Sequence, residues 1–375
     1  MPSFRVAVVD GDGIGPEVVP GTLNLLDQVA AHHGFTFHWT HLDWGSDRYL
    51  EHGAFMPAGG LESLTGYDAV FLGAVGDPRV PDDVSLWELL LPIRRDLRQH
   101  VNVRPVRTLP GIAGPLRDEQ PFDVLVIREN AEGEYTRVGG ALYENTADEI
   151  VVQSSVFTRR GTERVLRYAF EQARKRRRDV VSATKSNGLV HSMPFWDRVA
   201  DTVAADYPDV RYRKMHVDAL AAAFVLNPAT LDVVVGSNLF GDILSDLGAA
   251  LMGGIGLAAS ANINTVGDAP SMFEPVHGSA PDIAGKGIAN PTGQILSGAL
   301  MLRHLGQETA AAELEGALVR AVAGPAGHTR DVGGDATTQD LLRIVAEHLD
   351  HSTHTRVTAT PPIPGHTGGS SNNRQ

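Results

Sequence analysis

Apolar segments that resemble buried β-strands alternate along this chain with segments of helical periodicity. In the helical segments, apolar residues recur at three- and four-residue spacing, as on the buried face of a helix. This alternation is typical of an α/β fold. The strand-like segments are residues 4–9, 69–75, 101–106, 124–127, 180–182 and 231–235, and the helical ones are 15–31, 86–98, 160–174, 194–206 and 242–251.

The composition limits the classes of partner. The chain has 375 residues, 42% of them hydrophobic and 21% charged, which is long enough for about two domains. Its formal net charge of −13 argues against a nucleic-acid partner, because such a partner requires a dense basic surface. No apolar run approaches a membrane span, the N-terminus does not resemble an export signal, and cysteine is absent. We therefore expect no membrane partner and a reducing, cytoplasmic location.

Two acidic residues stand four positions apart after the strand-like segment 231–235. Gly236–Gly241 is predicted as the turn, and a helix starting there would put Asp242 and Asp246 on one face, with Cβ atoms about 5 to 6 Å apart. Two carboxylates at that spacing can bind one hard divalent cation such as Mg²⁺ or Mn²⁺. The alternative is an ordinary amphipathic helix that begins with an acid.

Three arginines stand where apolar segments end and the chain turns toward an edge or crevice. They are Arg94, Arg104 and Arg128. Guanidinium groups bind carboxylates bidentately, so the three together could hold a substrate with two carboxylates. Taken singly, each arginine could equally form a surface ion pair.

Two further residues could transfer protons. Lys185 follows the strand at 180–182, and a lysine at the carboxyl end of such a strand could accept a proton from an alcohol. Tyr135 could be the matching acid, or it could only pack within its own segment. That segment, residues 131–155, is predicted to form a two-stranded arm that needs a partner surface.

Two glycine-rich segments could approach a nucleotide. Asp10–Glu17 follows the first strand, but its Gly-x-Gly-x-Gly spacing is not the dinucleotide fingerprint of an ordinary Rossmann fold. Residues 271–291 are too long and too rich in glycine and proline for one regular element, so they are predicted to form a functional loop. In that loop Asp282 could bind ribose hydroxyls and would repel a ribose phosphate.

Together these segments resemble the metal-dependent β-decarboxylating dehydrogenases, the family of isocitrate, isopropylmalate, homoisocitrate and tartrate or D-malate dehydrogenases. The resemblance covers residues 4–345 and implies a two-domain, non-Rossmann α/β fold. Residues 1–98 plus 253–350 would form the cofactor-binding domain, and 99–252 the dimerisation and metal/substrate domain. The arm at 131–155 would clasp a second copy in a homodimer with shared active sites. Residues 351–375 are predicted to be a disordered tail.

The same resemblance implies the catalytic roles. Lys185 matches the general base and Asp218 a catalytic metal ligand, and both would come from the other subunit. Tyr135 matches the acid that protonates the product carbon. Asp242 and Asp246 match the remaining metal ligands, for Mg²⁺ or Mn²⁺. Lys185 would take the hydroxyl proton as hydride passes to NAD, and CO₂ would leave from the carbon β to the new ketone.

Binding roles follow in the same way. Arg94, Arg104 and Arg128 match the arginines that hold the substrate carboxylates. NADP-using members carry Lys and Tyr in place of Asp282 and Ile283, so the implied cofactor is NAD, and a monovalent cation such as K⁺ is a further candidate. The matching cofactor-binding residues are His277, Gly278, Ser279, Ala280, Asp282, Ile283 and Asn290, with Asn187 near the nicotinamide.

Substrate choice is predicted from residues 84–91, where Ser85, Trp87 and Leu90 are expected to contact the substrate. Trp87 would fill the space that isopropylmalate dehydrogenases leave for a branched alkyl group, and Glu88 with Leu90 argues against isocitrate. The segments 85–87, 152–161, 182–188 and 194–196 look most like the tartrate or D-malate branch.

We therefore predict NAD-dependent oxidation and decarboxylation of D-malate or tartrate. Asp83 stands where that branch carries a histidine and could alter the selection of the diacid. The alternatives are isopropylmalate or another substituted malate as substrate, and a regulatory subunit without turnover. The presence of every implied metal-binding and proton-transfer residue argues against the second alternative.

Overall fold

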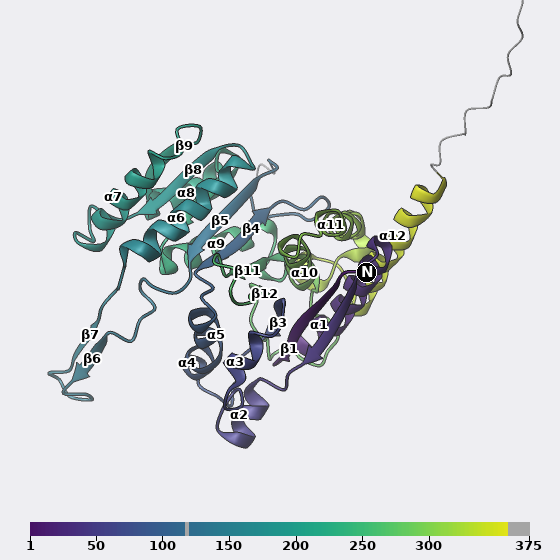
Figure 1. Cartoon of the computed structure of the whole chain (residues 1–375), viewed down its shortest axis with the longest axis horizontal. Helices are drawn as coiled ribbons and strands as arrows, with labels where there is room; N and C mark the ends of the chain where they lie inside the picture. The colour runs from purple at the N-terminus through teal and green to yellow at the C-terminus, as the bar shows by residue number, and fades with distance from the viewer. Residues whose placement is uncertain (117–119, 359–375) are drawn as a thin grey trace, which may run out of the picture.

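One mixed sheet organises the chain, whose computed structural model describes residues 1–116 and 120–358 (Figure 1). Its strand order is β2-β1-β3-β12-β11-β4-β5-β10-β8-β9, and β6 and β7 pair separately. The strands are β1 (Ser3–Gly11), β2 (Thr36–His41), β3 (Ala69–Ala74), β4 (Val101–Arg107), β5 (Asp123–Glu129), β6 (Gly139–Leu142), β7 (Ile150–Gln153), β8 (Asp179–Thr184), β9 (Arg211–His216), β10 (Val233–Gly236), β11 (Ala259–Ile263) and β12 (Ser271–Pro275).

Helices cover this sheet, which confirms the predicted α/β class. They are α1 (Gly15–His33), α2 (Ser46–His52), α3 (Gly60–Leu64), α4 (Asp82–Ser85), α5 (Leu91–Asp96), α6 (Arg159–Arg174), α7 (Ser192–Ala204), α8 (Val217–Leu226), α9 (Asn238–Met252), α10 (Thr292–His304), α11 (Glu308–Val322) and α12 (Thr338–Thr358). A π-helix, η1 (Leu86–Leu90), lies between α4 and α5. Among the described residues, no helix is long and apolar enough to cross a membrane.

The sheet has two parallel halves joined by antiparallel strands. β2, β1, β3 and β12 pair in parallel, as do β5, β10, β8 and β9. The β12–β11, β11–β4 and β4–β5 pairings between them are antiparallel. The half formed by β2, β1, β3 and β12, together with β11, comes from both ends of the chain. The half formed by β5, β10, β8 and β9, together with β4, comes from the middle of the chain. The division into two domains and their boundaries stay a prediction.

Helices α6 and α9 cover opposite faces of the second half. Side chains alternate between the two faces of a strand, so the even-numbered residues of β4 and β5 share one face. On that face Arg128 passes close to α9, where a Cβ on Gly241 would lie 2.6 Å from the Cβ of Arg128. Glycine at this helical position therefore lets a buried arginine lie directly against α9. The odd-numbered residues, such as Val103 and Leu125, line a cleft with Tyr168 of α6.

Several sequence predictions are corrected by these bounds. The predicted loop at 271–291 begins with β12, a strand whose five residues are all buried. The predicted turn Gly236–Gly241 is shorter, because Ser237 caps a helix that starts at Asn238. The last helix continues to Thr358, beyond the predicted start of the tail at 351, and residues 359–375 lie outside the described residues.

The predicted arm is present as a β-hairpin. β6 and β7 pair antiparallel with Gly139 opposite Gln153, and every residue of both strands is exposed. Figure 1 shows the hairpin extending away from the rest of the chain. Its apolar side chains Leu142, Ile150, Val151 and Val152 are between 51% and 69% exposed. An isolated two-stranded hairpin is only marginally stable in water. Its place in a dimer interface stays a prediction.

Candidate active site

The two aspartates of α9 share one guanidinium donor. Arg104 Nη1 lies 3.1 Å from Asp242 Oδ1 and 3.1 Å from Asp246 Oδ1, and it also donates to Ser245 Oγ at 2.8 Å. One nitrogen can reach both carboxylates because residues four apart lie on one face of a helix. Arg104 extends from the middle of β4 rather than from its end. The strand and the helix thus bring together an arginine and two acids from distant parts of the sequence.

A second arginine and a tyrosine complete the cluster around Asp242. Arg128 Nη1 binds Asp242 Oδ1, and its Nη2 donates to Asn238 Oδ1 at 2.7 Å. The Tyr135 hydroxyl donates to Asp242 Oδ2 at 2.8 Å. The Arg128 guanidinium also lies 5.4 Å from the centre of the Tyr135 ring. Both oxygens of Asp242 therefore contact a group that sequence analysis predicted to act on the substrate.

These contacts determine the protonation states in the cluster. Burial would raise the pKa of Asp242, but Arg128 and Arg104 outweigh it and lower that pKa, so Asp242 is ionised. Burial raises the pKa of Asp246, and the charge of Asp242 adds to the effect. Burial and then Arg104 lower the pKa of Arg128 to about 10, which leaves it protonated at neutral pH. Burial and the charge of Asp242 raise the pKa of Tyr135, so its hydroxyl keeps its proton and can donate it.

Arg94 lies in a separate buried ion pair. Its Nη2 donates to Glu274 Oε1 at 2.8 Å, and Asn262 Nδ2 donates to the same oxygen at 2.6 Å. The Nε atoms of Arg94 and Arg104 are buried without a hydrogen-bond partner among the described residues. Buried donors normally have a hydrogen-bond partner, so these two N–H groups are available to donate to the acceptor oxygens of an anionic ligand.

Lys185 and Asp218 pair with each other and are not part of this cluster. Lys185 Nζ donates to Asp218 Oδ1 at 2.8 Å. Their side chains are 33% and 66% exposed, and the hydrogen bond from Lys185 lowers the pKa of Asp218. Lys185 follows β8, and Asp218 lies in the first turn of α8. The chain therefore presents a lysine and a carboxylate at its surface.

The predicted substrate contacts in 84–91 differ in what they touch. Ser85 is buried, and its hydroxyl donates to the carbonyl of Asp82 at 3.1 Å, inside its own helical segment. Leu90 packs, partly buried, against a core cluster. Trp87 lines a cavity together with Tyr135 and Asp83. Of the three predicted contacts, the structure brings Trp87 beside the predicted acid.

The predicted cofactor loop follows β12 and packs against the first glycine-rich turn. Ile14 N donates to Ser279 O at 2.8 Å, and Glu17 accepts from Gly287 N at 2.9 Å. Gly13 has φ +59°, and a Cβ there would lie 2.0 Å from Ser279 O, so this close approach requires glycine. The first turn thus supports the loop that was predicted to bind the nucleotide.

The remaining predicted cofactor residues lie in or near this loop, with one exception. The His277 Nδ1 atom lies 3.0 Å from Gly278 O, and Asn290 Nδ2 donates to Asp331 at 3.0 Å. Asp282 is exposed, whereas Ile283 and Ala280 pack partly buried against the core. The exception is Asn187, which is exposed in the turn after Lys185 and lies far from the loop in the sequence.

Known proteins share both the sequence and the fold. Residues 5–345 match the family described as isocitrate/isopropylmalate dehydrogenase. A probable tartrate dehydrogenase/decarboxylase of Bacillus subtilis (strain 168) is 52% identical, over 93% of this chain and 99% of its own length. The D-malate dehydrogenase [decarboxylating] of Escherichia coli (strain K12) is 49% identical, over 92% and 99%. A crystal structure of isocitrate dehydrogenase from Methylococcus capsulatus has a TM-score of 0.84 at 33% identity, covering 92% of this chain and 99% of that one.

The chain belongs to the isocitrate/isopropylmalate dehydrogenase family. The predicted family and its tartrate or D-malate branch are confirmed, and the relatives place the chain among decarboxylating dehydrogenases.

A divalent cation of the kind this family uses fits the donor set on α9. Asp242 and Asp246 offer carboxylate oxygens, which hard cations prefer. The described residues contain no group of three or more His, Asp or Glu side chains that could hold a metal. Two carboxylates are few for such an ion, so a further ligand has to come from outside this cluster.

A nucleotide also fits the loop of this family member. His277 is buried, and its Nε2 atom has no hydrogen-bond partner among the described residues. Burial lowers the pKa of His277, so the ring is neutral and can offer one donor and one acceptor. The glycines at 278, 285 and 287 leave open space around the loop backbone.

Several residues that hold these groups in place were not predicted from the sequence. Glu274 pairs with Arg94, and Asn238 orients Arg128. Glu134 accepts from Ser237 Oγ at 2.8 Å and from Leu239 N at 3.0 Å, which ties the residue before Tyr135 to the start of α9. Glu134 could have been found from the sequence, because it stands next to Tyr135. Glu274 was overlooked because residues 271–291 were predicted to form a loop.

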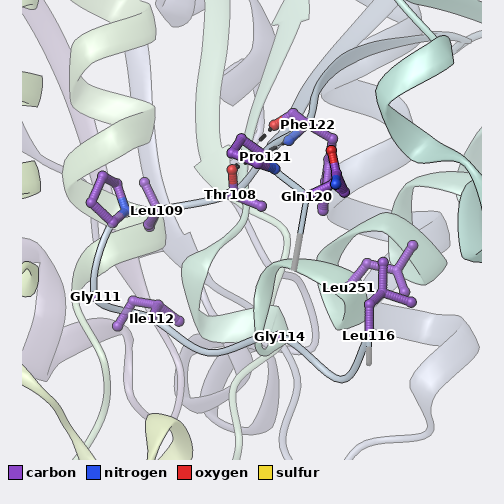
Figure 2. Close-up of a pocket in the computed structure, with 11 residues that line it drawn as sticks. Thr108, Leu109, Gly111, Ile112, Gly114, Leu116, Gln120, Pro121, Phe122 and Leu251 are labelled. Atoms are coloured by element: carbon purple, nitrogen blue, oxygen red, sulfur yellow. Dashed lines mark hydrogen bonds between the residues drawn. The ribbon is translucent and has the colours of Figure 1, made fainter. Parts of the chain in front are cut away.

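Another cavity lies outside the site. Figure 2 shows it between residues 108–116 and 120–122 on one side and Leu251 on the other, with Thr108 and Phe122 hydrogen-bonded at its edge. None of the predicted site residues lines it.

Proposed function

We propose that this protein catalyses the NAD-dependent, divalent-metal-dependent oxidation and decarboxylation of a small malate-type diacid, D-malate or tartrate. The observation that most supports this proposal is that Arg104, Arg128 and Tyr135 all contact Asp242, beside the cavity lined by Trp87. Relatives named for tartrate and D-malate support the same substrate class.

Each of the following predicted site residues has a defined task in this reaction. Arg94, Arg104 and Arg128 hold the substrate carboxylates, Asp242 and Asp246 hold the cation, and the 277–290 loop holds the nucleotide. NAD held by the loop would supply the hydride acceptor, and a divalent cation held by Asp242 and Asp246 would supply positive charge beside the oxygen of the carbon that is oxidised. Lys185 accepts the hydroxyl proton of the substrate. After CO₂ leaves, Tyr135 donates its hydroxyl proton to the carbon left behind.

A homodimer with shared active sites explains why Lys185 and Asp218 lie apart from this cluster. In the proposed dimer, Lys185 and Asp218 of each chain complete the active site of the other chain. Asp218 is then the further cation ligand. Exposed apolar side chains support an interface on the same parts of the chain. They include Leu189 and Val190 after Lys185, Val225 and Leu226 on α8, and Ile243 on α9, together with the arm.

Removal of divalent cations tests the metal requirement. With D-malate or a tartrate as substrate, a chelator is expected to reduce NADH formation by a factor of about 100 or more, because the cation contributes several kcal/mol to transition-state stabilisation. Addition of Mn²⁺ should restore the rate. Full activity after exhaustive dialysis against the chelator would contradict a role for Asp242 and Asp246 as ligands.

Replacement of two loop residues tests the nucleotide site. Asp282→Lys with Ile283→Tyr should raise the ratio of kcat/KM for NADP to that for NAD at least about tenfold, since a lysine pairs with the ribose phosphate that Asp282 repels. Glu62→Lys on the exposed side of α3 makes the same change in net charge and should leave the ratio unchanged. An unchanged ratio in the double variant would place the nucleotide elsewhere.

A further inference from the structure

Two guanidinium groups lie on the indole ring of Trp87. The Cζ atom of Arg95 is 5.0 Å from the ring centroid, and that of Arg137 is 4.5 Å from it. Both distances are within the range of a cation–π interaction. Arg95 lies on α5, close to Trp87 in the chain, whereas Arg137 stands at the root of the arm, just before β6. Arg137 is therefore the group that joins the Trp87 ring to a distant segment.

This contact borders the cavity next to the reacting centre. Trp87, Tyr135 and Arg137 line the same cavity of about 760 Å³, with the arm strands on its other side. The hydroxyl of Tyr135 reaches Asp242, and its backbone carbonyl accepts from Arg95 Nη2 at 2.6 Å. The Trp87 ring and its two arginines thus lie between the arm root and the residue proposed to protonate the product.

Trp87 lies in an irregular helical turn and is not fully packed in the core, so the contacts with the two arginines help to fix its ring. Pro92 has no amide hydrogen, so it cannot complete the α-helical bond to the carbonyl of Glu88. Instead Leu91 N bonds to Leu86 O, which makes residues 86–90 a π-helix. Short π-helical turns are frequent at functional sites. Trp87 itself is only partly buried, so core packing does not fix its ring from all sides.

We propose that Arg137 is a positioning residue that sets the width of the substrate pocket by holding the Trp87 ring. The inference rests on the proposed function and refines its substrate class. With the ring held, the pocket takes diacids whose third substituent is a hydrogen or a hydroxyl and excludes those with a branched alkyl group. The arm root, and not only the 84–91 segment, then determines specificity.

The test compares kcat/KM for D-malate with kcat/KM for isopropylmalate, with NAD and Mn²⁺. Arg137→Ala should lower this ratio about two- to fivefold, the factor that corresponds to one cation–π contact at an exposed position. Arg137→Lys keeps a cation over the ring and should retain most of the selectivity. Trp87→Ala should lower the ratio further, and Arg137→Ala added to Trp87→Ala should cause no additional change.

The possible contrary results are distinct. If the unmodified enzyme oxidises the diacids and Arg137→Ala leaves the ratio unchanged, the positioning role is wrong. If Arg137→Ala lowers the ratio equally with and without Trp87, Arg137 acts on the substrate directly and not through the ring. If the unmodified enzyme oxidises neither D-malate nor any tartrate stereoisomer, the proposed function itself fails and the inference falls with it. Size-exclusion chromatography of each variant separates these effects from a loss of assembly.

Discussion

Lys185→Met is expected to remove turnover and leave NAD binding intact. A positioned general base contributes a factor of about 10² to 10⁴, so kcat should fall by that amount. Methionine keeps the length and the apolar part of the side chain but cannot accept the hydroxyl proton. NAD affinity, measured by fluorescence titration, should be unchanged because the nucleotide loop at 277–290 does not depend on Lys185.

A matched control is available on the neighbouring strand. Lys214 is 37% exposed against 33% for Lys185, and it pairs with Asp201 at 3.0 Å as Lys185 pairs with Asp218 at 2.8 Å. Lys214→Met should therefore cost no activity. Unchanged oxidation in the Lys185 variant would overturn its assignment as the base, and equal losses in both variants would point to a general effect on folding.

Recovery of activity in mixed dimers is the second large effect that we expect. Tyr135→Phe removes only the hydroxyl that donates to Asp242, and this variant should form little decarboxylated product. Co-expression of the Tyr135→Phe and Lys185→Met chains should restore about a quarter of wild-type activity. Half of randomly formed symmetric dimers are mixed, and each mixed dimer has one intact site if Lys185 serves the partner.

The contrary result is equally clear. If differently tagged mixed dimers are purified and remain inactive, Lys185 and Tyr135 must act within one chain. The pairing of Lys185 with Asp218 in the isolated chain would then describe a surface contact and not half of a shared site.

The buried, regularly patterned parts of the fold could be predicted from the sequence. The apolar runs that became β3, β5 and β10 are uniform, and nearly all of their residues are buried, as are Val6, Ala7, Val8 and Val9 in the middle of β1. The edge strands β2 and β9 were missed because they do not show that pattern. The central strands β11 and β12 were missed although all their residues are buried, because Ala-Ser-Ala-Asn-Ile and Ser-Met-Phe-Glu-Pro are not long apolar runs. β9, with the sequence Arg-Tyr-Arg-Lys-Met-His, has no fully buried residue.

The candidate site was predictable where local spacing determines it. Asp242 and Asp246 share a helix face because they are four residues apart, and no distant contact is needed to see it. The partner of each arginine was not predictable, because Glu274, which binds Arg94, lies 180 residues further along the chain. The same holds for Arg137 and Trp87, which a sequence pattern cannot bring together.

The most direct test of the proposed function is a substrate panel assayed for NADH and CO₂ in parallel. The panel contains D-malate, the tartrate stereoisomers, isopropylmalate and isocitrate, each with NAD and Mn²⁺. We expect the highest kcat/KM on D-malate or a tartrate, with CO₂ released in step with NADH on D-malate. Preference for isopropylmalate would contradict the role of Trp87 in narrowing the pocket, and no NADH from any of these diacids would contradict the proposed activity.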